Sequence, residues 1–408
     1  MISKLKAGII AGTLICALGA CSPSTEHTSN SVIPIGKALD APTEFGLSAL
    51  GDELTYIPLE TSDSVLIGNN PIALVGKDYI VVSSANQPIF VFDKNGKFLN
   101  QIGRIGEGPD EYQGNAPMQV DDEKKIIYVY RGADKLLRFQ TDGSFLGSIT
   151  LQAEHMNVPY GDFIVNNDTV LMHQHLRSSP TTPYLGYFDG RSGQLIDTIP
   201  SLLYVSFPTD VAGIQSMRVM TNPSTILIDY GGGKQLVLTL QNHSIWAYNG
   251  HRYLKEEYID TIFTIQGTQL IPRYTLDLGA YTYPLEERNN GDYNTRAYMD
   301  PMYENEATIF FRLHTNHFPK PSAERVHYSG YYDKSSGEAQ VMKGDTISDD
   351  INRFLPLRIQ GVSTEGEFFG WLQAFDVVER RKEMPHPALA KIDEEDNPVL
   401  VIVGRNKK

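Results

Sequence analysis

Cysteine and basic residues are scarce in this chain. Its 408 residues include 2 Cys, and 49 Asp and Glu outnumber 35 Lys and Arg, which gives a formal net charge of −14. Such an acidic protein repels a phosphate backbone, so nucleic acid is excluded as an expected partner. Hydrophobic residues make up 41% and charged residues 21% of the sequence. That composition predicts a folded protein and not a disordered one.

No apolar run in the N-terminal segment is long enough to span a membrane. The run over residues 7–17 is shorter than the about 20 residues that a spanning helix needs, and a polar stretch follows it. Two lysines precede the run, which is typical of an export signal. Leu18-Gly19-Ala20-Cys21 resembles the lipobox of bacterial lipoproteins. The resemblance implies cleavage before Cys21 and acylation of its sulfur, which anchors a protein permanently; an ordinary secretory peptide is the alternative.

The same cleavage would leave Cys21 as the only cysteine. The mature protein could then form no internal disulfide and would have no free cysteine nucleophile. Lipoproteins displayed on the cell surface usually carry an acidic run after the cysteine, and here Glu26 is the one acid over residues 22–26. We therefore expect an outer-membrane lipoprotein that faces the periplasm, with cell-surface display as the alternative.

Long helical periodicity is also missing. From residue 53 onward, short runs of Val, Ile, Leu, Phe and Tyr alternate with turns rich in Gly, Asp and Asn. A unit of strand, tight turn and strand recurs. Its copies lie at residues 89–99, 136–146, 187–193, 331–337 and, more weakly, 262–267, and a last strand follows at 399–403. Four-stranded sheets recurring about every 40 to 50 residues are the repeat of a β-propeller.

Five hairpins and the last strand predict six blades. The predicted fold is all-β: a six-bladed β-propeller of four-stranded antiparallel blades, closed by pairing of residues 53–59 with 399–403. The expected organisation is a signal peptide over 1–20, a flexible tether over 21–50 and a propeller over 51–408, with insertions near 201–222 and 284–303. A pair of β-sandwiches or a β-rich solenoid is the alternative.

Residues 92–99, 102–112 and 393–401 carry a family resemblance. They resemble an uncharacterised family of six-bladed propeller lipoproteins from Gram-negative bacteria, with a wider relation to NHL-like and TolB-like propellers. Asp110 stands where that family more often has a small residue. The resemblance implies the fold from about Leu54 to the end and no settled activity.

A glycine-rich loop over residues 103–114 offers the first candidate site. It lacks the strand–loop–helix context of a phosphate-binding motif, so that interpretation is rejected. Arg104, Glu107, Glu111 and Tyr112 are candidate binding residues on a propeller face. The favoured alternative is structural, with Arg104 paired to Glu111 and Tyr112 packed between blades.

Histidines provide weak metal candidates. His173 and His175 lie two residues apart on a predicted strand and therefore face the same side. A polar surface pair is the favoured interpretation. His314 and His317 have a spacing that suits a turn, which makes them weaker still. We predict no metal or other cofactor.

Tyrosines gather in the second predicted insertion, led by Tyr281 and Tyr283. Their flat rings with polar tips suit stacking on sugars or peptides, and packing on their own blade is the alternative. No Gly-x-Ser-x-Gly or His-Glu-x-x-His motif is present. The sequence predicts a lipid-anchored, extracytoplasmic, non-catalytic binding or scaffold module for a protein, peptide or glycan. The alternative is a metal-dependent lyase or lactonase of NHL-like type using the central channel, where His173 is the first residue to check.

Overall fold

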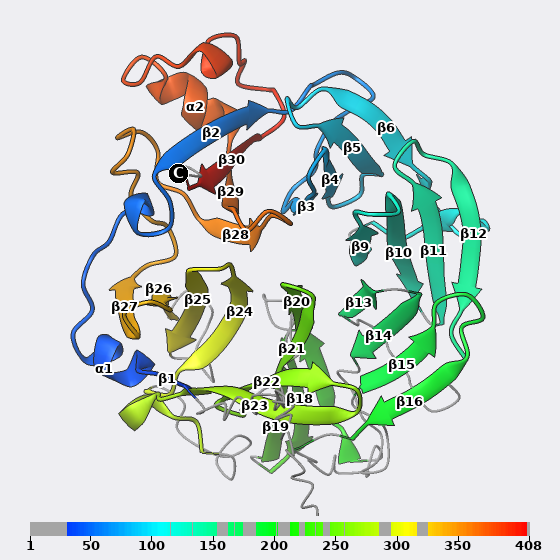
Figure 1. The fold of residues 1–408 in the computed structure, drawn as a ribbon, viewed down its shortest axis with the longest axis vertical. Coiled ribbons are helices and arrows are strands. Elements are labelled where there is room, and N and C mark those ends of the chain that lie inside the picture. Colours follow the sequence, from blue (N-terminus) through cyan, green and yellow to red (C-terminus); the bar gives the residue numbers. More distant parts are fainter. Residues whose placement is uncertain are drawn as a thin grey trace, which may run out of the picture.

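Six sheets surround a central axis in the computed structural model and form a six-bladed β-propeller, as the sequence predicts (Figure 1). The structure describes residues 31–405 except 115, 133, 153–161, 167, 174–184, 201, 203–212, 220–224, 233, 240–244, 257, 285–294 and 316–324. The predicted signal peptide, Cys21, His175 and His317 lie outside the described residues. Among the described helices, none has the length and apolar character needed to cross a membrane.

Blades 1 to 5 each contain four consecutive strands, the first of which lies nearest the axis, whereas the outermost strand of blade 6 comes from the N-terminal part of the chain (Figure 1). Blade 1 contains β3 (Ile72–Val75), β4 (Tyr79–Ser83), β5 (Ile89–Asp93) and β6 (Phe98–Ile102), and blade 2 contains β9 (Met118–Asp121), β10 (Ile126–Gly132), β11 (Lys135–Gln140) and β12 (Phe145–Thr150). Blade 3 contains β13 (Phe163–Asn166), β14 (Thr169–His173), β15 (Leu185–Asp189) and β16 (Leu195–Ile199), and blade 4 contains β20 (Ile245–Tyr248), β21 (His251–Lys255), β22 (Thr261–Gln266) and β23 (Gln269–Leu276). Blade 5 contains β24 (Tyr298–Glu304), β25 (Thr308–Thr315), β26 (Val326–Asp333) and β27 (Glu338–Lys343), and blade 6 contains β28 (Ile359–Val362), β29 (Phe368–Leu372), β30 (Val399–Gly404) and β2 (Glu53–Pro58).

The ring closes through the two ends of the chain, as predicted. β2 pairs antiparallel with β30 from Glu53 opposite Gly404 to Pro58 opposite Val399. This pairing satisfies the backbone groups that two free sheet edges would expose.

The core lies between blades. Alternate side chains of a strand point to opposite faces, so the apolar strands bury residues against both neighbours. In β25, Phe310 packs with the cluster shared with blade 6, and Phe311 packs with the cluster shared with blade 4. Six apolar clusters of this kind fill the interfaces around the ring in the described part of the chain.

The recurrent outer hairpin uses one turn chemistry. In blade 1, Asp93 Oδ1 accepts from the backbone N–H of Asn95 at 2.8 Å and of Lys97 at 2.9 Å. Gly96 has φ +83°, and a Cβ there would lie 2.0 Å from the Pro58 carbonyl oxygen. An aspartate followed by a glycine therefore sets the turn, because its carboxylate caps the turn and glycine adopts the left-handed conformation.

The predicted flexible tether is wrong for residues 31–50. β1 (Ser31–Ile33) pairs parallel with Tyr274–Leu276 of β23, and α1 (Ile35–Asp40) and the short helix η1 (Leu47–Ala49) follow. Ile33 and Ile35 are fully buried. The segment is ordered against the propeller because its aliphatic side chains complete the apolar cluster between blades 4 and 5.

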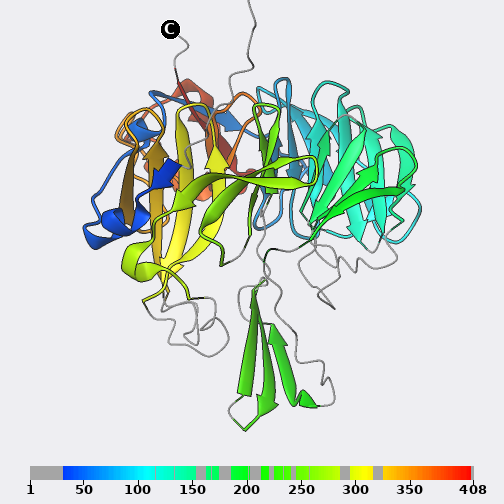
Figure 2. The same ribbon diagram turned by 60° about the horizontal axis from the view of Figure 1, so that its bottom comes forward.

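The insertions also differ from the predicted bounds. The first contains a separate three-stranded sheet, β17 (Ser216–Val219), β18 (Thr225–Gly231) and β19 (Lys234–Thr239), which extends past residue 222 and projects from the propeller (Figure 2). The second ends earlier than predicted, because Tyr298–Glu304 form the innermost strand of blade 5. A further excursion between β29 and β30 contains α2 (Ala374–Arg380) and the short helix η6 (Pro387–Leu389).

The strand order defines two faces of the propeller. Neighbouring strands of a blade are antiparallel, so the connections into each innermost strand and those between the second and third strands share one face. The inserted sheet β17–β19 leads into the innermost strand of blade 4, so we call this the insertion face. The outer hairpin turns, such as Asp93–Gly96, lie on the opposite, hairpin face.

Candidate functional site

Three side chains of metal-binding type meet on blade 5 at the insertion face. They are Asp300 from β24, His314 from β25 and His327 from β26, and one ligand atom from each lies within 4.8 Å of the others. His314 and His327 are direct partners across the β25–β26 ladder. Asp300 lies in a bulge where the pairing shifts between Met299 and Met302. Bulges re-aim side chains, and here the Oδ2 atom of Asp300 lies 3.2 Å from the Nδ1 atom of His314.

Burial and charge set the protonation of this group. His314 is 2% exposed, whereas Asp300 and His327 are half-buried. Burial opposes ionisation of Asp300, but the hydrogen bond and charge of His314 outweigh it and hold the pKa of Asp300 below its ordinary value. Burial, and secondarily the neighbouring His314, lowers the pKa of His327. These shifts favour the carboxylate form of Asp300 and the neutral imidazole form of His327 at neutral pH, and these are the forms that bind metal ions.

Arginines surround the cluster. Arg312 is 9% exposed, and its Nε and Nη1 atoms have no hydrogen-bond partner; the Nε atom of Arg325 has none either. Arg312 acts electrostatically on both Asp300 and Arg358. The side chain of Arg358 is paired, with its Nε atom 3.1 Å from Asp345 Oδ2. The arginine N–H groups that lack hydrogen-bond partners can donate to an anionic group.

The histidines singled out from the sequence have different outcomes. His173 is 2% exposed on β14, so the favoured interpretation of a polar surface pair is wrong for this residue. His175 lies outside the described residues, and the weaker metal interpretation of the pair stays a hypothesis. His314 lies beside His327, and its predicted partner His317 lies outside the described residues. Sequence reasoning missed this because the two histidines become neighbours only through the register of β25 and β26. A signal was present in the sequence, because each histidine lies in a run rich in apolar and aromatic residues, 308–315 and 326–333, that is typical of a strand.

Tyr112 is a structural residue of the glycine-rich connection. It is 1% exposed, accepts a hydrogen bond from the Ile89 N–H at 2.7 Å and donates one to the Ile102 carbonyl at 2.5 Å. Burial raises the pKa of Tyr112 to about 12, so the hydroxyl stays protonated. Its ring packs with Val129 and Phe139 of blade 2. The predicted packing between blades is confirmed for this residue.

The charged residues of the same connection lie at the insertion face. Arg104 and Glu111 are neighbours through the short parallel pair β7 (Arg104–Ile105) and β8 (Glu111–Tyr112), and among the described residues no ion pair joins their side chains. Glu111 instead accepts from the Gly108 N–H at 2.6 Å. Glu107 is exposed, and its carbonyl accepts from Arg131 Nη2 at 2.5 Å. Arg104 and Glu107 are thus accessible, and their binding role stays a prediction.

The two tyrosine candidates lie at the connection between blades 4 and 5. Tyr281 donates to Asp40 Oδ1 at 3.3 Å, which joins the connection to α1. Tyr283 is buried, with its ring centroid 4.9 Å from that of Tyr258, which lies 6.3 Å from Tyr298. Tyr283 therefore packs within the molecule, and stacking on a ligand by either residue stays a prediction.

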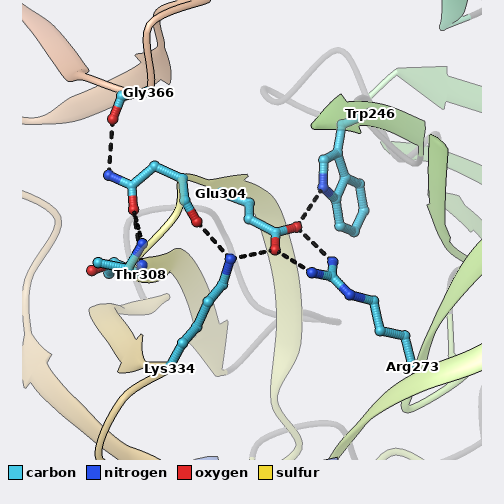
Figure 3. A network of polar contacts seen from close by, with 8 residues as sticks. Trp246, Arg273, Glu304, Thr308, Lys334 and Gly366 are labelled. Atoms are coloured by element: carbon cyan, nitrogen blue, oxygen red, sulfur yellow. Dashed lines mark hydrogen bonds and ion pairs between the residues drawn. The ribbon is translucent and has the colours of Figure 1, made fainter. Parts of the chain in front are cut away.

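The other end of β24 holds a different polar cluster (Figure 3). Glu304 is 2% exposed, and its carboxylate accepts from Arg273 at 2.8 and 2.7 Å, from Lys334 at 2.6 Å and from Trp246 at 3.2 Å. Burial opposes ionisation, but these partners hold the pKa of Glu304 below its ordinary value. Asn305 extends the network, because its carbonyl accepts from Lys334 at 2.5 Å. We call these five residues the Glu304 network.

The Glu304 network reaches three blades. Trp246 and Arg273 belong to blade 4, and Glu304 to blade 5. Asn305 Nδ2 donates to the carbonyl of Gly366, in the turn of blade 6, at 2.8 Å (Figure 3). Its acceptors and donors are used within the protein, which indicates a structural role.

Comparisons with known proteins agree with this fold. The family described as "Domain of unknown function (DUF4934)" matches residues 30–404. A crystal structure described as a "Putative exported protein" from Bacteroides fragilis is similar at 18% identity and a TM-score of 0.61, over 88% of this chain and 97% of that one. A member of the duf4221 family from Bacteroides vulgatus is similar at 11% identity and a TM-score of 0.50, over 86% and 96% of the two chains. No curated protein matches the sequence.

Proposed function

Since the chain belongs to the DUF4934 family, whose function is unknown, we propose from its own features that it is a lipid-anchored, extracytoplasmic binding or scaffold module. Its partner is a protein, peptide or glycan, and it acts without catalysis. The fold alone does not specify this role, because propellers support many functions.

The observation that carries the proposal is the inserted sheet β17–β19. The six blades close without it, yet it projects from the insertion face of a rigid ring (Figure 2). Met217 on β17 is 59% exposed. An element that adds surface and is not needed for closure of the ring suits contact with a partner.

The location rests on the N-terminal pattern. The lipobox-like residues ending at Cys21 support an outer-membrane lipoprotein, and the structural neighbour described as exported supports an extracytoplasmic site. We favour the periplasmic face, with cell-surface display as the alternative. In cells fed a radiolabelled fatty acid, the wild type should be labelled and the Cys21→Ala variant should not; equal labelling would contradict the anchor.

The binding role can be tested by site-specific photo-crosslinking in the cells that naturally make the protein. A photoreactive residue replaces Met217 on the inserted sheet or, as a control, the exposed Lys97 on the hairpin face. We expect a discrete adduct from position 217 and none from position 97. The same adducts from both positions, or none from either, would refute a partner at the insertion face.

The alternative lyase or lactonase would use the central channel. It requires ligands that converge on the axis from several innermost strands. Within the described residues, the one group of three metal-binding side chains comes from a single blade. This arrangement supports the binding module over a channel enzyme.

A further inference from the structure

We propose that Asp300, His314 and His327 form a binding site for a divalent transition-metal ion of the Zn²⁺ type on blade 5. The proposal concerns a site at the insertion face and does not rest on the lipid anchor or on the inserted sheet. It rests on the geometry of three adjacent strands, the chemistry of the three side chains and the charges around them.

The geometry is close to that of a bound site. Ligand atoms around a tetrahedral Zn²⁺ lie about 3.3 Å apart, because Zn–N and Zn–O bonds are about 2.0 to 2.1 Å long. The Asp300 Oδ2 and His314 Nδ1 atoms are already 3.2 Å apart, and all three ligand atoms fall within 4.8 Å. Bringing all three ligand atoms to that spacing therefore requires a movement of at most about 1.5 Å. The half-buried side chain of His327 can supply that movement by rotating.

The backbone presents these side chains together. His314 and His327 face each other across a regular ladder, so their Cβ atoms lie on the same side of the sheet. The bulge in β24 places Asp300 beside them. The ring of Tyr298, 5.1 Å from that of His314, packs against the most buried ligand. Neighbours of this kind restrict rotamers and thereby favour a preformed site.

The ligand set selects the metal. Two imidazoles and one carboxylate suit Zn²⁺ and its transition-metal neighbours, whereas Ca²⁺ and Mg²⁺ prefer six or more oxygen ligands. Three protein ligands leave a fourth position, and the partial exposure of Asp300 and His327 leaves that position open to solvent. The site is thus of the open type that binds a water molecule or a ligand group.

The surrounding charges determine what completes the site. Arg358 is neutralised by Asp345, but Arg312 and Arg325 carry donors without hydrogen-bond partners near Asp300. The positive charges of these two arginines weaken the binding of a metal cation unless an anion binds with it. We therefore expect the fourth ligand to be an anionic group, held between the metal ion and the arginines.

Calorimetric titration of the full chain with Zn²⁺ tests the proposal. We expect one equivalent to bind to the wild type, and the affinity to fall about tenfold or more in Asp300→Asn and in His327→Ala. Neither variant removes the fully buried His314, so folding can be verified by far-UV circular dichroism. His251→Ala, which removes an exposed histidine from blade 4, is the matched control and should bind as the wild type does. Ca²⁺ should not bind at this site.

A charge variant gives a result that a damaged fold cannot imitate. Arg325→Gln removes a repelling cation, so Zn²⁺ should bind about threefold more tightly or better. Co²⁺ in place of Zn²⁺ should give the strong visible absorption of a four-coordinate site in the wild type and not in His327→Ala. Absence of Zn²⁺ binding by the wild type would overturn the proposal. Binding that is the same in the Asp300, His327 and His251 variants would overturn it as well.

Discussion

Two polar clusters occupy the two ends of the same strand, and their partners differ. At the hairpin-face end of β24, the Glu304 carboxylate accepts from Arg273, Lys334 and an indole, so a buried charge is fully matched. At the insertion-face end, Asp300 meets two histidines, while nitrogens of the nearby Arg312 lack hydrogen-bond partners. The first cluster is complete within the protein, and the second has capacity to bind something more. Burial and charge alone do not identify a functional site. Buried polar groups that have no hydrogen-bond partner within the protein do.

The largest effect on stability should follow from removing the charge of Glu304. Glu304→Gln leaves Arg273 and Lys334 without their counter-ion in a buried place, which should lower the free energy of unfolding by about 3–5 kcal/mol. Denaturant titration measures this loss. Glu383→Gln breaks the exposed pair with Arg380 and is the control, with no measurable change expected. Equal effects of the two substitutions would remove the contrast between the clusters.

Binding of Zn²⁺ by Asp300, His314 and His327 should stabilise the folded protein. Zn²⁺ at about 100 times its Kd should raise the free energy of unfolding of the wild type by about 2.7 kcal/mol, because it binds the folded state. His327→Ala binds about tenfold more weakly or worse, so it should reduce this gain to about 1.4 kcal/mol or less, and it should change the metal-free protein little. Glu304→Gln should retain the stabilisation by Zn²⁺, since Glu304 lies at the end of β24 opposite to Asp300. Loss of the gain in Glu304→Gln would show that the two clusters are coupled.

Acid should erase the difference between wild type and Glu304→Gln. The folded-state pKa of Glu304 lies below its ordinary value of 4.5, so its contribution is present above that pH and is lost as the pH falls through the folded-state pKa. Denaturant titrations between neutral pH and pH 3 should show the two proteins converging. A constant difference across this range would mean that the carboxylate charge is not what stabilises the network.

The fold was largely predictable because its signals are local and repeated. Turns such as that at Gly96 and alternating apolar strands identify blades, and counting them identifies the closing strand β2. The order of residues 31–50 was missed because Ile33 and Ile35 are buried by strands more than 200 residues away in the sequence. The metal-type cluster was missed for a different reason, because the pairing of His314 with His327 depends on the register of two strands and not on spacing within one strand.

The smallest expected effects sharpen the same distinction at the glycine-rich connection. The buried Tyr112 hydroxyl accepts one hydrogen bond and donates another within the protein, whereas the Arg104 side chain is exposed. Tyr112→Phe leaves the buried Ile89 N–H without a partner and should lower the free energy of unfolding by about 1–2 kcal/mol. Arg104→Ala should leave the free energy of unfolding unchanged within error, as measured by denaturant titration. A loss in Arg104→Ala as large as that in Tyr112→Phe would make Arg104 structural and would remove it from the candidate binding residues.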